Sequence, residues 1–185
     1  MLTHIGTQRI ETERLILRKF NSTDADSVFK NWASDELVQS WYSEPIYETK
    51  EKTSELLNTY INSYEKEDYY RWAITLKDTN ECIGQIAIFL VDNKNHFCEY
   101  EYCIGREFQK NGYATEATKA IIDFSFNKIN FNKVQICHKS GNPKSQSVIE
   151  KCGLTYEGAL RDYFYMNGKY VDRHYYSVLK SEWCN

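Results

Sequence analysis

The segment Glu99–Thr118, EYEYCIGREFQKNGYATEAT, decides the fold. Its first six residues predict a strand that ends at Ile104, and a polar loop then runs to Gly112. A helix is predicted from about Ala114 to Lys128, so the glycine lies directly before a helix N-terminus. Glycine lets the backbone turn tightly there, and the first helical turn leaves unpaired N–H groups at the positive end of the helix dipole. This order of elements predicts a cradle for phosphate groups.

Two common nucleotide motifs are absent from the sequence. Gly112 is followed by Tyr113, so the GxxxxGK[ST] pattern of a P-loop is missing. No GxGxxG follows the first predicted strand, which argues against a dinucleotide-binding domain. For these residues alone, the plain alternative is an ordinary turn in front of a helix.

The flanking residues predict the rest of the fold. Strands are predicted over residues 14–18, 72–76, 82–91, 97–104 and 133–138, followed by a hairpin that turns at Asn167-Gly168. Helices are predicted after Asn21 or Ser22, around residues 57–64, and from the cap Asn142 and Pro143 to Gly153. The order predicts an α+β fold, a single domain over residues 1–185. Its mixed, mostly antiparallel sheet of about seven strands is flanked by four helices.

Composition excludes several classes of protein. The 185 residues are 42% hydrophobic and 15% aromatic, which excludes a disordered chain. The net charge of −3 argues against nucleic acid as a partner. No apolar leader or spanning segment is present, so we expect a cytoplasmic protein without a membrane partner. The six cysteines form no CxxC pair and the four histidines are scattered, which predicts free thiols and no metal site.

The segment Gln109–Ala114, QKNGYA, resembles the Q/R-x-x-G-x-G/A signature of the GNAT superfamily of N-acetyltransferases, which grips the pyrophosphate of acetyl-coenzyme A. The resemblance covers about residues 10–183. It is closest to the branch that contains the ribosomal-protein N-terminal alanine and serine acetyltransferases. The other matching segments are Glu11–Arg18, Asn142–Leu154, Glu157-Gly158, Asn167–Lys169, Asp172 and Glu182-Trp183.

The resemblance implies direct transfer of an acetyl group from acetyl-coenzyme A to a primary amine. It implies that the acetyl donor is bound by Gln109, Lys110, Asn111, Gly112, Tyr113, Ala114, Thr115 and Asn142, and by main-chain groups near Cys103 and Ile104. Two positions depart from the family pattern. Lys110 stands where the loop usually has a second glycine. Ile149 stands where many members have a tyrosine that protonates departing coenzyme A, which leaves Ser145 as the substitute suggested by this branch.

Glu99 and Glu101 are the candidate carboxylates for deprotonating the amine. They alternate on one face of the predicted strand, with Tyr100 and Tyr102 on the other. The resemblance gives Glu99 the position of the family carboxylate and makes Glu101 an addition that faces the substrate. The alternative is that both are solvated carboxylates of an exposed strand face.

Trp41, Tyr42 and Trp32 are the candidate contacts for the acceptor. Trp41 and Tyr42 are predicted to lie in a connection between helices, where specificity residues often occur. The alternative for Trp32 is simple helix packing.

The acceptor itself stays open. An α-amine with a pKa of about 7.8 costs only about 1 kcal/mol to deprotonate at pH 7, against about 4.6 kcal/mol for a lysine amine, so a weak base is enough for a protein N-terminus. The alternatives are a polyamine or other small-molecule amine, and a sensor that binds acetyl-coenzyme A with weak catalysis. A homodimer is also expected.

Overall fold

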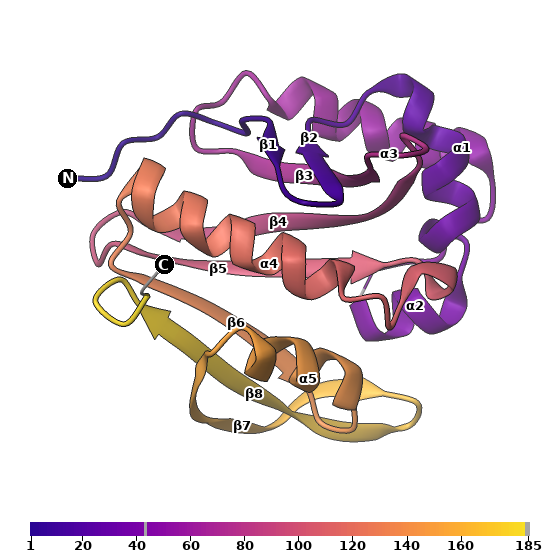
Figure 1. Cartoon of the computed structure of the whole chain (residues 1–185). Coiled ribbons are helices and arrows are strands. Elements are labelled where there is room, and N and C mark those ends of the chain that lie inside the picture. The colour runs from indigo at the N-terminus through magenta and orange to yellow at the C-terminus, as the bar shows by residue number, and fades with distance from the viewer. Residues whose placement is uncertain (43, 184–185) are drawn as a thin grey trace.

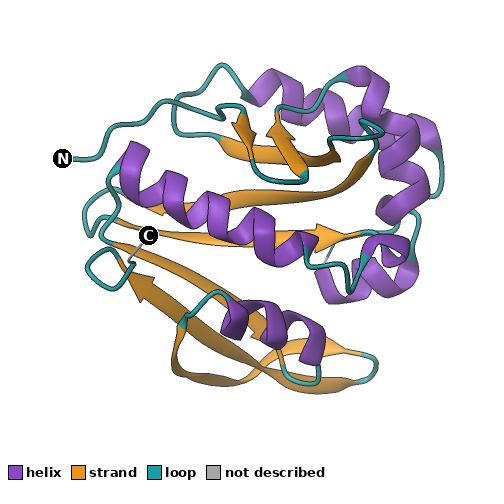
Figure 2. Cartoon of the chain, in the orientation of Figure 1, coloured by secondary structure: helices purple, strands orange, loops and turns teal. Residues whose placement is uncertain are grey.

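The structure is a computed structural model that describes residues 1–42 and 44–183. One sheet crosses the molecule, with helices on both of its faces (Figure 1, Figure 2). The strands are Ile10–Glu11 (β1), Leu15–Arg18 (β2), Tyr70–Leu76 (β3), Cys82–Asp92 (β4), Phe97–Ile104 (β5), Lys133–Lys139 (β6), Thr155–Met166 (β7) and Lys169–Leu179 (β8). The helices are Ala25–Val28 (α1), Glu36–Tyr42 (α2), Lys50–Ser63 (α3), Tyr113–Phe124 (α4) and Pro143–Lys151 (α5). Short π-helical turns, Phe29–Ala33 and Ser125–Ile129, continue α1 and α4.

The strand order is β1-β2-β3-β4-β5-β6-β8-β7, and β5 and β6 are the parallel neighbours in an otherwise antiparallel sheet. These two strands pair over only three positions, from Phe97 with Lys133 to Glu99 with Gln135. Beyond Glu99 they diverge, as Figure 1 shows. We call the opening between them the wedge. Its sides are the β5 wall, residues 100–104, and the β6 wall, residues 136–139.

Two apolar clusters hold the helices against the sheet. One lies under α4 and α5 and includes Ile121, Ile149 and Trp72. The other lies under α1, α2 and α3 and includes Trp32 and Leu57. The wedge therefore opens between two packed layers of helices.

The predicted fold class is confirmed, but the prediction missed two short elements. Within the described residues the sheet has eight strands and five α-helices stand around it. The added strand, β1, has two residues and is too short for a periodic signal. The added helix is α2, so the prediction that Trp41 and Tyr42 lie in a loop was wrong. The Asp35 carboxylate caps α2 by accepting from the N–H groups of Leu37 (3.0 Å) and Val38 (3.2 Å).

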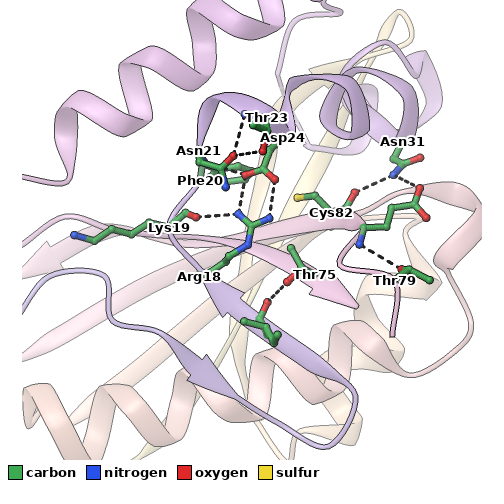
Figure 3. A network of polar contacts seen from close by, with 12 residues as sticks. Arg18, Lys19, Phe20, Asn21, Thr23, Asp24, Asn31, Thr75, Thr79 and Cys82 are labelled. Atoms are coloured by element: carbon green, nitrogen blue, oxygen red, sulfur yellow. Dashed lines mark hydrogen bonds and ion pairs between the residues drawn. The ribbon is translucent and has the colours of Figure 1, made fainter. Parts of the chain in front are cut away.

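Of the two predicted helix caps, Asn21 and Ser22, the structure uses Asn21, which caps a 3-10 turn, Ser22–Asp24, that leads directly into α1 (Figure 3). The Asn21 side chain accepts from the N–H of Thr23 at 2.9 Å, and the Asp24 carboxylate accepts from the N–H of Asn21 at 2.9 Å. Arg18, at the end of β2, donates to both oxygens of Asp24 at 2.7 Å. This largely buried pair fixes the entry of the chain into α1.

The predicted cap of α5 and the predicted turn of the last hairpin are confirmed. Asn142 caps α5 with Pro143 in its first turn, and Asn167-Gly168 turns the last hairpin with both φ angles positive. Five cysteines are free thiols, and Cys184 lies outside the described residues. In residues 1–42 and 44–183, no helix is long and apolar enough to cross a membrane, and no three metal-ligating side chains gather.

Candidate active site

The wedge holds a cavity of about 890 Å³. The β5 wall and the β6 wall form its two sides, and residues of α2 cover it between them. The loop before α4 and the first turn of α5 form its mouth. The splayed strands thus bring residues from both halves of the chain around one space.

The predicted phosphate cradle lies at this mouth. Gly112 has φ +82° and stands immediately before α4, whose first hydrogen bond runs from the N–H of Glu116 to the Gly112 carbonyl at 3.0 Å. Within the described chain, no partner occurs for the main-chain N–H groups of Tyr113, Ala114 and Thr115. These donors therefore gather at the positive end of the α4 dipole, where a phosphate group is stabilised.

Lys110 adopts φ +67°, a left-handed conformation that glycine takes without strain. The lysine therefore keeps the backbone path of the missing glycine and adds a positive charge at the mouth of the cavity.

Lys110→Gly is expected to raise the free energy of unfolding by about 1 kcal/mol, because a left-handed residue with a Cβ costs roughly 1–2 kcal/mol. The same change should weaken acetyl-coenzyme A binding by removing a charge. Lys110→Ala is the matched control, since it loses the charge and keeps the strain. Thermal denaturation and calorimetric titration measure the two effects. Equal melting temperatures for Lys110→Gly and Lys110→Ala would show that the left-handed conformation of residue 110 does not destabilise the fold.

Arg14 fixes the cradle loop from the other end of the chain. Its guanidinium donates to the Asn111 carbonyl at 2.9 Å and pairs with the Glu116 carboxylate at 2.7 Å. It also lies 4.7 Å from the centre of the Tyr113 ring. In the sequence, Arg14 stands out only as part of a segment that matches the family. Its contact with the cradle loop could not be predicted, because no local pattern reveals a contact between residues about a hundred positions apart.

Gln109 joins the two sides of the mouth. Its side-chain amide donates to the Ile104 carbonyl at 2.9 Å and accepts from the Lys144 ammonium at 2.8 Å. Lys144 lies in the first turn of α5, where the Asn142 side chain accepts from the Ser145 N–H at 3.2 Å. Gln109, Lys144 and Asn142 therefore line the same entrance.

Ser145 has an unexpected neighbour. Its hydroxyl lies 3.3 Å from the hydroxyl of Tyr102, and both residues line the cavity. Burial raises the pKa of Tyr102, so the phenol keeps its proton at neutral pH. Ile149 is fully buried in the core. The sequence analysis did not predict the contact between Tyr102 and Ser145. The only relevant signal was the alternation along β5, which puts Tyr102 on the opposite face from Glu99 and Glu101.

Glu99 is 2% exposed and does not line the cavity. Its carboxylate pairs with Arg173 and accepts from the Gln135 side chain at 3.0 Å. Glu99 lies at the last paired position of β5 and β6, and its ion pair with Arg173 links this position to β8.

Glu101 does line the cavity. Its Oε1 accepts from the Tyr42 hydroxyl at 2.7 Å and from Arg71 at 3.1 Å. In the part of the chain that is described, Oε2 has no hydrogen-bond partner. This carboxylate therefore has one oxygen that no other described residue engages.

Trp41 and Tyr42 line the cavity from α2, and Trp41 is 37% exposed. Trp32 is 1% exposed, packs in the core cluster under α1–α3, and is not among the lining residues. Cys103 and Ile104 form the outer part of the β5 wall.

The main-chain groups of β5 alternate in direction. The Gly105 N–H donates to Ile83 of β4, and Cys103 pairs opposite Gln85. In an antiparallel ladder, every second residue points its N–H at the same neighbour. The N–H of Cys103 therefore faces β4, whereas those of Tyr102 and Ile104 face the wedge.

These features fit acetyl-coenzyme A. The mouth carries the unpaired N–H groups of α4 together with Lys110, Lys144 and Arg106, which suit a group rich in phosphate. A cavity of about 890 Å³ between the β5 wall and the β6 wall leaves room for the long arm of the coenzyme.

Known proteins agree with this geometry. A sequence profile described as "Acetyltransferase (GNAT) domain" matches residues 14–155. The uncharacterized N-acetyltransferase YoaA of Bacillus subtilis is 30% identical over 171 residues, which cover 92% of this chain and 96% of that protein. A crystal structure of spermidine N-acetyltransferase from Vibrio cholerae, in complex with CoA and spermine, has 25% identity and a TM-score of 0.80, covering 94% of this chain and 100% of that chain.

The fold also matches a ribosomal-protein alanine acetyltransferase from Vibrio fischeri, with 21% identity and a TM-score of 0.80 over 96% of this chain and 100% of that chain. The cradle, the wedge and the matched profile lead to one family. The chain belongs to the GNAT acetyltransferases and uses acetyl-coenzyme A as its acetyl donor.

Proposed function

We propose that this protein acetylates the α-amine of a small molecule or a protein N-terminus, with Glu101 as the base. The observation that carries the proposal is that Glu101 lines the cavity while its Oε2 oxygen has no hydrogen-bond partner among the described residues. Glu99 was the first choice from sequence, but its oxygens are engaged by Arg173 and Gln135. Similarity to a spermidine N-acetyltransferase supports a polyamine as the second candidate acceptor.

Bound acetyl-coenzyme A supplies a thioester that a neutral amine attacks directly, with departure of the coenzyme thiolate. Gly112 and the first turn of α4 hold the phosphates, with Lys110 and Lys144 beside them. Glu101 takes a proton from the amine at Oε2, while Arg71 and Tyr42 hold its other oxygen in place.

The β5 wall supplies donors for the carbonyl oxygen. The N–H groups of Tyr102 and Ile104, which lack a neighbouring strand beyond Glu99, are fixed dipoles facing the wedge. Ser145 holds the proton for the departing sulfur. Tyr102 donates to the Ser145 hydroxyl oxygen and so directs the serine hydrogen toward the cavity.

A thiol-release assay tests the function. Protein, acetyl-coenzyme A and a panel of N-terminal peptides, amino acids and polyamines are mixed, and free coenzyme thiol is measured over time. Release that depends on the amine supports the proposal. Tight binding of the coenzyme without turnover of any amine would overturn it in favour of a sensor.

Glu101→Gln is expected to lower kcat roughly 10²-fold at pH 7, because the amine loses its base. Much of this loss should return at pH 9, where an α-amine with a pKa of about 7.8 is neutral without help. Glu99→Gln is the matched control, since it removes a buried carboxylate on the same strand face. We expect it to lower the melting temperature and to change the rate equally at all pH values. A Glu101→Gln rate ratio that is flat across pH would exclude Glu101 as the base.

A further inference from the structure

The charges that line the cavity are strongly one-sided. One carboxylate, Glu101, lies among the described lining residues, and Arg71 already pairs with it. The cationic lining residues are Arg106, Lys110, Lys139, Lys144, Lys151 and Arg173. A polyamine would bring several positive charges into a space that offers one partly neutralised carboxylate.

Most of these cations are accounted for. Lys110 and Lys144 lie at the phosphate mouth, Arg106 pairs with Asp35, and Arg173 pairs with Glu99. Lys151 is exposed at the end of α5, whereas Lys139 is buried. Lys139 is 7% exposed, and among the described residues it has no carboxylate partner.

The Lys139 ammonium makes few contacts. It donates to the main-chain carbonyl of Ser40 at 2.7 Å and lies 5.1 Å from the centre of the Phe164 ring. A carbonyl at the end of α2 offsets part of the charge, but a buried ammonium without a counter-ion remains costly. Burial accordingly lowers the pKa of Lys139.

Lys139 and Glu101 face the same side of the splayed sheet. Gln135 and Lys139 share one face of β6, since they are four residues apart, and Gln135 contacts Glu99, which shares a face of β5 with Glu101. Helix α2 contacts both groups, with the Ser40 carbonyl on Lys139 and the Tyr42 hydroxyl on Glu101. A cation and a carboxylate therefore lie on opposite walls of the wedge, and both are contacted by the last turn of α2.

We infer that the acceptor carries a carboxylate near its amine, and that Lys139 binds this carboxylate while Glu101 receives the amine. The inference rests on the proposed function and names its substrate class. A charge pair between ligand and Lys139 supplies the counter-ion that the chain lacks, because a paired buried charge costs far less than an isolated one. The carboxylate is either the main-chain carboxylate of a very short peptide or amino acid, or an acidic side chain next to an N-terminus.

Two matched pairs of acceptors test this on the wild-type protein. The dipeptide Ala-Gly is compared with its C-terminal amide, and Ala-Asp amide is compared with Ala-Asn amide. We expect kcat/KM to be at least about tenfold higher for the acidic member of one pair, which also identifies the source of the carboxylate. Spermidine should be a poor acceptor.

Three variants assign the effect to Lys139. In Lys139→Met the acidic and neutral members should react within about twofold of each other, whereas Lys139→Arg should keep the preference. Lys110→Met is the control at the phosphate mouth, where we expect a higher KM for acetyl-coenzyme A and an unchanged preference between acceptors. A preference that survives in a folded Lys139→Met protein would overturn the inference.

Equal rates for both members of both pairs in the wild type, or faster turnover of spermidine, would also overturn it. If no amine is acetylated, the proposed function fails. Calorimetric titration of the same pairs into the protein bound to coenzyme A then decides the inference by itself. Tighter binding of the acidic member supports it, and equal binding rejects it.

Discussion

Ser145→Ala is expected to lower kcat roughly 10²–10³-fold, which is the usual loss when one donor aimed at developing charge is removed. The Ser145 hydroxyl contacts Tyr102 and lines the cavity, and the helix cap is made by the Asn142 side chain instead. The affinity for acetyl-coenzyme A should stay close to that of the wild type. Pre-steady-state thiol release and calorimetric titration separate the two quantities.

Tyr102→Phe distinguishes positioning from an independent donor. If Tyr102 acts by orienting Ser145, the single change lowers kcat about tenfold, and the double variant is no slower than Ser145→Ala alone. Additive losses in the double variant would mean that each hydroxyl acts separately. A normal kcat in Ser145→Ala, with only a lower melting temperature, would make Ser145 a structural residue.

The second large effect is expected at Gly112. Gly112→Val should abolish measurable binding of acetyl-coenzyme A, because a β-branched residue resists φ +82° and its Cβ would lie 3.3 Å from the Arg14 guanidinium. Both effects displace the N–H groups at the start of α4. Calorimetric titration measures the loss directly.

Gly168→Val is the matched control for backbone strain. Gly168 has φ +78° in the hairpin turn, and an added Cβ would meet nothing within 4 Å. We expect this variant to lose stability and to bind acetyl-coenzyme A normally. Unchanged binding in Gly112→Val would remove the cradle from the mechanism, whereas lost binding in both variants would indicate a general effect on folding.

Local sequence signals were sufficient for most of the fold. Asn142 and Pro143, Asn167 and Gly168, and the strand before Gly112 each specify their backbone through their own chemistry. Helix α2 was missed because it has only seven residues, although Asp35 can cap it and the pairs Leu37-Val38 and Trp41-Tyr42 recur at helical spacing. These local signals specify secondary structure, but they do not specify the chemical roles of the individual side chains on each element.

The roles of the two glutamates show where sequence reasoning ends. Alternation correctly places Glu99 and Glu101 on one face of β5, but it carries no information about the strand beside them. Gln135 and Arg173 engage Glu99 because β6 is still paired there, and two residues later the strands have separated. Which carboxylate is available therefore depends on where the pairing stops. That position is set by contacts between distant segments.

The short parallel joint between β5 and β6 has a consequence for the lifetime of the protein. Strands β1–β5 and β6–β8 share main-chain pairing at only three positions, so the rest of their association depends on the apolar core that they share under α4 and α5. A ligand that contacts both walls adds its binding free energy to their association, about 2.7 kcal/mol at one hundred times its Kd. Resistance to proteolysis should therefore rise with the supply of acetyl donor, so that the abundance of the enzyme follows the availability of its own substrate.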